Sequence, residues 1–453
     1  MDKLEAYLTV IPLPLLAVVG FFALMIFLIM PAETRFYVTF ILMPVWLTTS
    51  RCPDLGFIQA FTKISSGMLF LLMGVSALLR PGNKRPMPGM AWLYFAASMF
   101  YMICVIGTSD KLDAIVMEIQ WVFAVLAAVA AVMAMTTLED VHKMFMVFGL
   151  GMIIALCVPL SALILNPSTS FLLGTNRFVP WGSPPNLIGL LFVVAGPTLL
   201  YLIMTTKSHS IKPILIGFLI ANIGMAILTG SRMTVFSLVI SLGLMALPLV
   251  KRPGLLIAGG MIGAILLPVV LGVNVDSADR LGDLSTSGRL AIWWNYLVLS
   301  LKRPLGLFGT SGYSIVEDPT ISAHPHSSWA EMLYLGGWPY LLLLAVPAIY
   351  ALRCTYQVWK QRDLYSVNNH SYLIHAMAAF MASMYFQSFF NQALYHPTYT
   401  LTFVGLFLTF LFMALAAELP QQREIYDEWL EEWSEEEYDE YEEWDDTKVP
   451  APT

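Results

Sequence analysis

The sequence predicts an all-α polytopic membrane protein, and two observations carry that prediction. Hydrophobic residues make up 58% of the 453-residue chain, charged residues only 12%, and the mean hydropathy is +0.71. A soluble domain has about 25% charged residues. The apolar residues also gather into a series of separate runs, most of them near the roughly 17–25 residues that a transmembrane helix needs.

The runs predict about 12 or 13 transmembrane helices at this length criterion. The doubt in the count lies in the first eighty residues, where the run 36–50 is short enough to be half a span. The chain divides into N-terminal helices (1–170), a central core (171–352), C-terminal helices (353–417) and an acidic tail (418–453). The runs lie at 10–30, 36–50, 64–80, 88–107, 114–136, 144–165, 186–206, 211–229, 232–250, 254–272, 328–352, 372–390 and 396–417.

Basic residues predict the orientation, because connections on the cytoplasmic side of a membrane are enriched in Lys and Arg. If the runs alternate in direction, the basic residues at 80–85, 143, 207–212, 251–252 and 353–362 share one face. We expect that face to be cytoplasmic. The opposite, outer face then carries the connection 166–185 and one long loop, 273–327. A loop of this length is usually functional or disordered.

The long loop contains the stretch STSGRLAIWWNYLVLSLKRP, which has apolar residues at helical spacing. This pattern, with its tryptophan pair, predicts an amphipathic helix on the outer surface of the membrane. The apolar residues are Leu290, Trp294, Leu297, Val298 and Leu301.

The tail holds fifteen acidic and two basic residues, interleaved with Trp and Tyr, so the rest of the chain has a net charge of +6. Such charge density is typical of disorder or of a solvated helix, and we expect disorder. The tail either binds a basic partner or only increases solubility.

The chain contacts membrane lipids, and we expect no nucleic-acid partner. The four scattered cysteines have no metal or redox spacing, so we expect no metal and no cofactor.

Two arginines occupy unusual places. Arg232, in ILTGSRMTVF, opens a span on the outer face, and Arg289 opens the amphipathic helix. A cation at a helix N-terminus opposes the helix dipole, which favours anions there. Either Arg232 is an interfacial arginine whose charge reaches water, or arginine and free N–H groups together hold an anion. Two arginines placed this way favour a doubly charged anion such as pyrophosphate.

His324 and His326 flank Pro325 just before a span. Pro325 favours an extended conformation for His324 and leaves His326 near the helix start, with Ser327 or Ser328 as the cap. The pKa of a histidine side chain lies near neutral pH, so a histidine there can take a proton from a hydroxyl. It can also merely form hydrogen bonds.

Three further residues are second-rank candidates. Asn186, in RFVPWGSPPNLIGLLF, caps the next helix or hydrogen-bonds a sugar, and Trp181 could stack on one. Arg280 lies in the same long loop as Arg289.

The motifs together resemble those of the O-antigen ligase and O-antigen polymerase superfamily. His326, Ser327, Gly337 and Tyr340 fit the spacing of its ligase signature. The stretch GRLAIWWNYLVLSLKRPLGLFGTSGYSI resembles its Arg–Trp helix and the loop that follows. TGSRMTVF resembles its Ser-Arg motif, and GSPPN its Asn-Pro-Asn turn. The resemblance covers roughly 175–350, while the first 170 residues match only as generic spans.

The resemblance implies an inverting, metal-independent glycosyltransferase that faces the periplasm. Its donor is a glycan on undecaprenyl pyrophosphate, and its acceptor is a glycan or a lipid A core. If the roles of the family's motif residues are assigned to the matching positions here, Arg232 and Arg289 hold the pyrophosphate, and His326 activates the acceptor hydroxyl.

Ligase and polymerase activities share these motifs, and the signature favours a ligase slightly. An anion transporter is a less favoured hypothesis, because transporters place charges near the bilayer midplane and often show inverted repeats. A non-catalytic scaffold for polysaccharide export is a third hypothesis.

Overall fold

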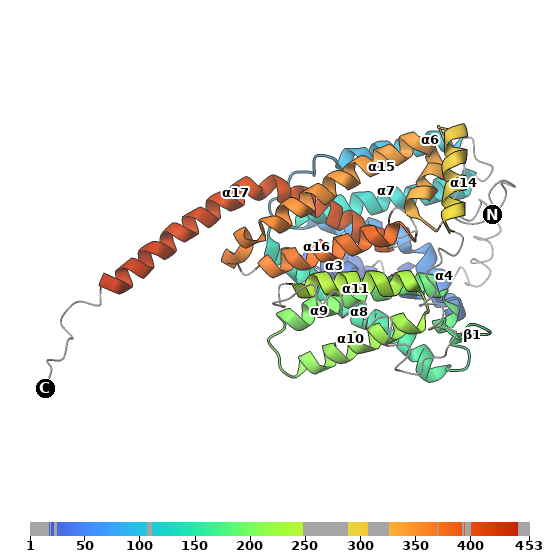
Figure 1. Cartoon of the computed structure of the whole chain (residues 1–453), viewed down its shortest axis with the longest axis horizontal. Coiled ribbons are helices and arrows are strands. Elements are labelled where there is room, and N and C mark those ends of the chain that lie inside the picture. Colours follow the sequence, from blue (N-terminus) through green and yellow to red (C-terminus); the bar gives the residue numbers. More distant parts are fainter. Residues whose placement is uncertain are drawn as a thin grey trace.

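The structure, a computed structural model, describes residues 25–106, 111–247, 289–306, 326–368, 370–391 and 400–442, together with positions 18, 20, 21 and 394. Long helices lie side by side in one bundle, and a single helix crosses one of its ends (Figure 1). The fold class predicted from the sequence, an all-α polytopic membrane protein, is confirmed.

The elements follow the predicted runs closely. Every predicted run from 36–50 to 232–250, and every run from 328 on, is occupied by a helix. The run 254–272 and most of the run 10–30 lie outside the described residues. The helices are α3 (Ala32–Thr49), α4 (Phe57–Ile64), α5 (Ser66–Leu79), α6 (Ala91–Val105), α7 (Lys111–Ala134), α8 (Leu138–Leu165), α9 (Pro185–Thr205), α10 (Ile211–Leu228), α11 (Arg232–Ala246), α14 (Arg289–Lys302), α15 (Ser328–Lys360), α16 (Ser371–Ser388) and α17 (Thr400–Glu442).

Fewer of these helices meet a strict length and hydropathy criterion than the 12 or 13 spans that the sequence predicts. Within the described part of the chain, six helices are long and apolar enough to cross a membrane, or seven if the bent pair α4–α5 is one span. The helices α6 and α11 are apolar but shorter. The count falls because the sequence prediction accepted short runs, and because some runs lie outside the described residues.

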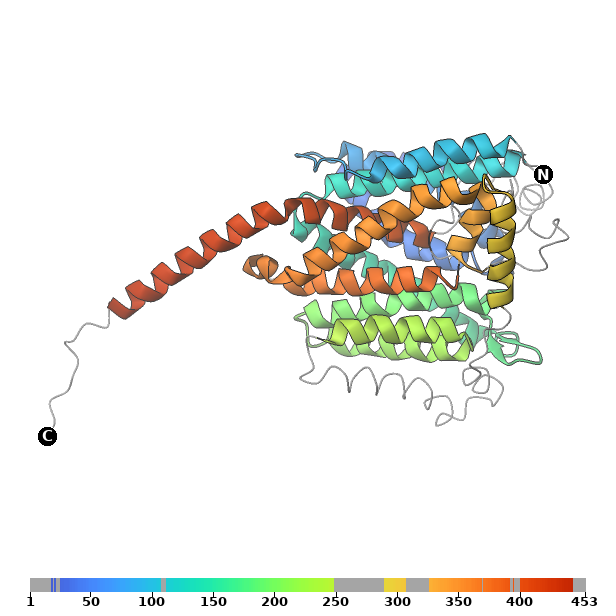
Figure 2. The same ribbon diagram turned by 45° about the horizontal axis from the view of Figure 1, so that its top comes forward.

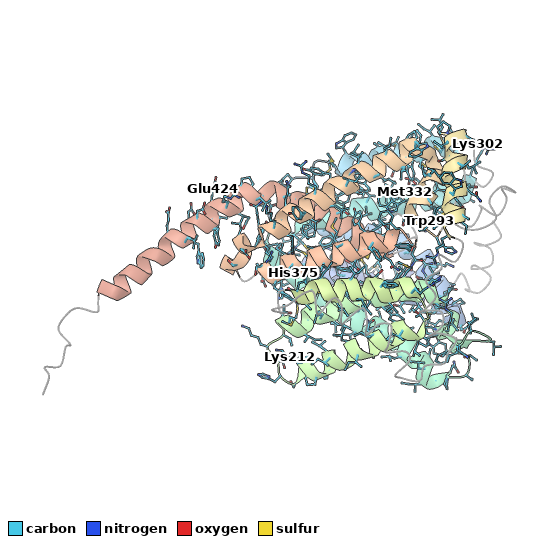
Figure 3. All side chains as sticks on the ribbon, viewed as in Figure 1. Lys212, Trp293, Lys302, Met332, His375 and Glu424 are labelled. Carbon is cyan, nitrogen blue, oxygen red and sulfur yellow. The ribbon has the colours of Figure 1, made fainter. Side chains whose placement is uncertain are left out.

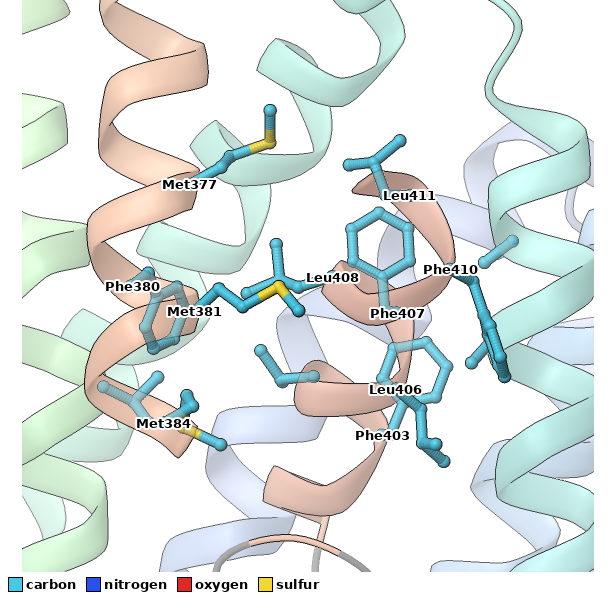
Figure 4. Close-up of a cluster of buried hydrophobic side chains, with 14 of the residues drawn as sticks. Met377, Phe380, Met381, Met384, Phe403, Leu406, Phe407, Leu408, Phe410 and Leu411 are labelled. Atoms are coloured by element: carbon cyan, nitrogen blue, oxygen red, sulfur yellow. The ribbon is translucent and has the colours of Figure 1, made fainter. Parts of the chain in front are cut away.

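The core of the bundle is formed by helices that are apolar on nearly every side, as expected of helices buried among others. Side chains from α16 and α17 interlock there, with Met377, Phe380 and Met381 on one side and Phe403 and Phe407 on the other (Figure 4). One connected apolar core extends from α3 to α17. This core includes residues on both sides of the predicted divisions at 170 and 352.

The helix α14 lies across the end of the bundle, roughly perpendicular to the long helices (Figures 1 and 2). The side chain of Tyr296 is 1% exposed and packs against Tyr334 of α15, so one side of α14 faces the protein. The predicted apolar stripe faces elsewhere, because Leu290, Trp294 and Leu301 are exposed. The predicted helix is confirmed, and the exposed part of its apolar stripe is available to lipid.

Basic residues of the connections gather at the end opposite α14. Figure 3 places Lys212 at that end and Trp293 and Lys302 at the other. Two ion pairs join helices and connections at the basic end. Arg80 contacts Asp140 at 2.6 Å, and Arg85 contacts Glu418 at 2.9 Å. Apart from the bent pair α4–α5 and the crossing helix α14, the successive helices alternate in direction, which is the assumption on which the predicted orientation rests.

The acidic tail differs from its prediction. α17 continues as a helix to Glu442 and projects beyond the bundle at the basic end (Figure 1). We expected disorder from residue 418 on. The buried part of α17 supplies the costly helix nucleus, and the Glu-rich continuation then only extends it. The predicted boundaries at 352 and 417 fall inside α15 and α17, respectively.

The helix α15 is broken near its start. Gly337 has φ 67° and ψ −159°, which a residue with a side chain rarely adopts. The Pro304–Gly306 loop that follows α14 enters this break, and the N–H of Trp338 donates to the Pro304 carbonyl at 3.0 Å. A Cβ on Gly337 would lie 2.3 Å from the Gly306 nitrogen. Glycine at 337 therefore lets α14 and its loop sit against α15.

We predict that Gly337→Ala lowers the thermal unfolding midpoint of the purified protein. The added methyl group collides with the Pro304–Gly306 loop in a strained backbone conformation, which costs roughly 1–3 kcal/mol. Gly217→Ala is the matched control, because a Cβ at this α10 position meets nothing within 4 Å. Equal midpoints for the two variants would contradict this role of Gly337.

Candidate functional site

The end of α16 anchors the starts of two other helices. α16 ends at Ser388, and Phe390 and Asn391 lie in the turn that follows it. Here the Phe390 carbonyl accepts a hydrogen bond from Arg289 Nη1 at 3.0 Å, and the Asn391 carbonyl accepts one from Ser328 Oγ at 3.1 Å. The starts of α14 and α15, far apart in the sequence, are therefore fixed to one point.

Aromatic residues reinforce both attachments. The ring of Trp293 lies 5.8 Å from that of Phe390, which holds the first turn of α14. Trp329 Nε1 donates to Ser388 Oγ at 2.9 Å, which holds the first turn of α15. His326 comes two residues before Ser328, so its backbone leaves directly from this anchored turn.

Arg232 is held by a separate tight turn. Gly230 has φ 58°, the Ser231 N–H donates to Thr229 Oγ1 at 3.1 Å, and Thr234 Oγ1 donates to Ser231 Oγ at 3.0 Å. Close packing fixes the turn against α9, because a Cβ on Gly189 would lie 2.0 Å from Thr234 Oγ1. Arg232 is the first residue of α11, as predicted.

The three principal candidates come together at the α14 end of the bundle. Burial, and then the positive charge of Arg232, lower the pKa of Arg289. Burial, and then the charge of Arg289, lower the pKa of His326 below its ordinary value of 6.5. Each residue is thus close enough to the next for its charge to be felt. The structure brings together side chains from three segments that the sequence could only name separately.

His326 has an unusual backbone. Its φ is +46°, a left-handed conformation that costs free energy for a residue other than glycine. The residue is open to solvent on one side, while the protein packed around its imidazole is enough to disfavour the charged form. Ser327 occupies the N-cap position of α15, but its side chain makes no capping bond, in contrast to the prediction that Ser327 or Ser328 caps the helix. Ser328 instead binds the end of α16.

The arrangement suits an anion. Two guanidinium groups in each other's field repel, and a bound anion would offset that repulsion. Each arginine is also the first described residue of its helix, where free N–H groups and the helix dipole favour negative charge. The neutral form of His326, favoured by its lowered pKa, can accept a proton beside that anion.

The second-rank candidates have different surroundings. Asn186 does not cap α9, because Pro184 stands at the N-cap position, and its Oδ1 accepts from Arg177 Nη2 at 3.1 Å. The indole N–H of Trp181 donates to the Val158 carbonyl at 3.0 Å, which gives this side chain a packing role against α8. Arg280 and His324 lie outside the described residues.

Sequence reasoning missed Arg177. This residue is in β2 (Arg177–Phe178), which pairs antiparallel with β1 (Phe171–Leu172). Its Nε donates to the Thr229 carbonyl at 2.7 Å, and its Nη2 donates to Asn186. Arg177 therefore ties the hairpin and the start of α9 to the turn that carries Arg232. The sequence offered one indication of this role. Arg177 is a cation in the outer connection 166–185, far from the connections that are rich in Lys and Arg.

The chain matches no protein-family model, and no curated protein matches it. Among the described residues there is no group of three or more His, Cys, Asp or Glu side chains that could hold a metal ion.

We predict that His326 titrates below pH 6.5. Diethyl pyrocarbonate reacts with neutral imidazole, so the modification rate of the peptide containing His326, followed by mass spectrometry, should rise to its plateau with a midpoint below 6.5. Arg289→Gln removes a charge that opposes protonation, so it should move the midpoint to higher pH. The matched control is Arg303→Gln, an exposed arginine just beyond α14, which should leave the midpoint unchanged. A midpoint at or above 6.5 in the native protein would disprove the assignment.

Proposed function

We propose that this protein is a membrane glycosyltransferase of the O-antigen ligase and polymerase superfamily. It moves a glycan from undecaprenyl pyrophosphate to an acceptor hydroxyl at the periplasmic face of a bacterial inner membrane. The observation that supports this most directly is the meeting of Arg232, Arg289 and His326 at the end of the bundle where α14 lies.

The reaction needs a base for the acceptor hydroxyl and positive charge beside the leaving pyrophosphate. The site offers His326 as the base, and Arg232 and Arg289 as the positive charges. His326 takes the proton of the acceptor hydroxyl, and the hydroxyl oxygen attacks the anomeric carbon of the donor. The bond from that carbon to the pyrophosphate oxygen breaks, and its electron pair leaves with the pyrophosphate. Because the attack comes from the side opposite the leaving group, the anomeric configuration inverts.

The charge that develops on the leaving group is the main energetic problem. Before the donor arrives, the turn at 229–231 holds the backbone that leads into Arg232, and the Phe390 carbonyl holds the guanidinium of Arg289. Preorganised cations of this kind stabilise a developing anion without reorganising during the reaction. The lowered pKa of His326 keeps its imidazole neutral, and thus basic, at neutral pH.

The lipid part of the donor needs an apolar path between helices. A cavity of about 260 Å³ lies among α11, α15 and α16, lined by Leu244, Trp359, His375 and Ala378 among others, toward the basic ends of these helices. The α14 ends of these same three helices carry or flank Arg232, His326 and Phe390. An isoprenoid tail that runs along them from the pyrophosphate would therefore pass apolar helix surface before it reached this cavity.

We predict that Arg232→Ala, Arg289→Ala and His326→Ala each abolish the mature glycan in a deletion strain while inserting normally into the membrane. Loss of a general base typically costs 10²–10⁴-fold, and loss of one preorganised donor to a developing anion roughly 10²–10³-fold. Gels of lipid-linked and mature glycans measure the effect. Accumulation of full-length lipid-linked polymer indicates a ligase, and accumulation of single lipid-linked units indicates the alternative, a polymerase.

Two control variants remove the same kinds of side chain from other places. Arg303→Ala deletes an exposed arginine at the α14 end, and His209→Ala deletes an exposed histidine at the opposite end. Both should sustain normal glycan. If the three site variants also do so, the catalytic proposal fails. Uptake of an anion by the protein alone in liposomes would then favour the transporter hypothesis, and loss of export without either activity the scaffold hypothesis.

We predict a positioning role for Arg177. Arg177→Gln frees the Thr229 carbonyl and so loosens the turn that holds Arg232. Charge-assisted hydrogen bonds contribute roughly 1.5–3 kcal/mol, so kcat/KM for the lipid-linked donor should fall about tenfold or more. Arg177→Lys, which keeps a charged donor, should restore part of the rate, and Lys302→Gln should have no effect. Equal rates in the Gln variant and the native protein would contradict this role.

A further inference from the structure

The cavity of about 260 Å³ among α11, α15 and α16 lies toward the end of the bundle that is opposite α14. Figure 3 places His375, which lines the cavity, near the basic end, and Trp293 of α14 at the other end. Leu352 and Tyr356 of α15 also line the cavity and are 38% and 59% exposed, so the cavity opens toward the outside of the bundle. Three alanines of α16 leave the space, because their side chains end at Cβ. These alanines are Ala378, Ala379 and Ala382.

The polar side chains deep in the cavity use their hydrogen-bonding groups within the protein. Trp359 Nε1 donates to His375 Nδ1 at 2.9 Å, so the imidazole carries its proton on Nε2, which donates to the Leu244 carbonyl at 2.6 Å. Thr355 Oγ1 donates to the Ala351 carbonyl at 2.8 Å. The wall therefore presents mainly carbon atoms. Apolar cavities of this kind exclude water and bind apolar molecules.

The mouth of the cavity lies on a side of α15 that faces lipid. This helix is long and apolar enough to cross a membrane. Val346, Ile349 and Leu352 recur every three residues, so they share one side of the helix, and they are 46%, 66% and 38% exposed. Hydrocarbon chains of the bilayer therefore lie against the opening, and an aliphatic chain is the apolar molecule closest to it.

Cations surround the same opening. Arg353 and Lys360 are exposed, and they come three residues before and four residues after Tyr356, on the same side of α15. The guanidinium of Arg362 lies over the ring of Trp359, 5.3 Å from its centroid. Because Trp359 lines the cavity, Arg362 places a positive charge beside it.

Most donors of the Arg362 guanidinium remain available to an anion. Its Nη1 donates to the Trp359 carbonyl at 3.2 Å. Asp363 is its neighbour in the chain, but no carboxylate in the described part of the chain forms an ion pair with Arg362. A guanidinium has five N–H donors in a planar arrangement that matches two oxygens of a phosphate. An aliphatic chain in the cavity and a phosphate on Arg362 would thus lie next to each other.

We propose that the cavity binds one acyl chain of an anionic phospholipid and that Arg362 and Lys360 hold the phosphate of this lipid. The sequence predicts that the basic end is cytoplasmic, and basic pockets between membrane helices on that side bind anionic lipid head groups. The pyrophosphate proposed for Arg232 and Arg289 lies at the other end of the bundle, so it is not the head group bound here. The proposal depends on the membrane fold and not on the glycosyltransferase activity.

The test measures lipid binding to the full chain by native mass spectrometry, after bound lipids have been removed in detergent. Phosphatidylglycerol and phosphatidylcholine with identical acyl chains are titrated separately. The first phosphatidylglycerol molecule should bind roughly tenfold more tightly than the first phosphatidylcholine molecule, because two cations meet its phosphate. Ala378→Phe fills the cavity and should abolish this tight site. Arg362→Gln leaves the cavity open and should bring the two affinities close together.

Two control variants change the same kinds of side chain elsewhere. Ile220→Phe enlarges a side chain of α10 that is 65% exposed, and Lys207→Gln removes an exposed cation in the connection from α9 to α10, at the same basic end. Both proteins should keep the preference for phosphatidylglycerol. If Ala378→Phe folds poorly, Leu352→Trp blocks the mouth instead, at a position that is partly exposed.

Equal affinities of the native protein for the two lipids would overturn the proposal. An undiminished preference in Arg362→Gln, or in the variant that fills or blocks the cavity, would overturn it as well. Undecaprenyl phosphate is the competitor to include, because tighter binding of this lipid would assign the cavity to the glycan carrier instead of a phospholipid. None of these outcomes depends on Arg232, Arg289 or His326, so failure here and failure of the glycosyltransferase proposal are distinguishable.

Discussion

The end of α16 is the constraint on which the rest of the site depends. Phe390 and Asn391 lie in the turn that follows α16, which ends at Ser388. The carbonyls of these two residues receive Arg289 and Ser328, so two distant segments are anchored to one turn. The Arg289 guanidinium held by this carbonyl is also close enough to Arg232 to be affected by its charge. Without this anchor, α14 would be attached to the bundle mainly by Tyr296 and by its loop at Gly337.

Glycine determines how closely the anchored segments can approach. Gly337 breaks α15 and admits the loop after α14, and Gly230 turns the chain so that α11 opens on Arg232. Both residues have positive φ angles. The family-like spacing from His326 to Gly337 thus has a physical meaning in this chain. His326 precedes the short first segment of α15. The far end of that segment, at Gly337, is held by the loop that follows α14.

The sequence predicted the membrane fold, the helix positions and the arginine starts of α11 and α14, because hydropathy and local spacing determine these features. It did not predict that Arg177 supports the Arg232 turn, since that contact joins residues 52 positions apart through a backbone carbonyl. It offered sugar stacking as one role for Trp181, and it did not predict that the indole N–H of Trp181 donates to the Val158 carbonyl of α8. Helix periodicity likewise cannot distinguish the two sides of α14, because both are apolar.

The central claim is that Arg232, Arg289 and His326 form one site for a lipid pyrophosphate. The most direct test is a cryo-electron microscopy map of the protein in lipid nanodiscs with undecaprenyl pyrophosphate bound. The account predicts pyrophosphate density between the two guanidinium groups, beside the His326 imidazole, with the isoprenoid density leaving along α11, α15 and α16. Pyrophosphate density elsewhere, or arginine side chains that point apart in the complex, would contradict it.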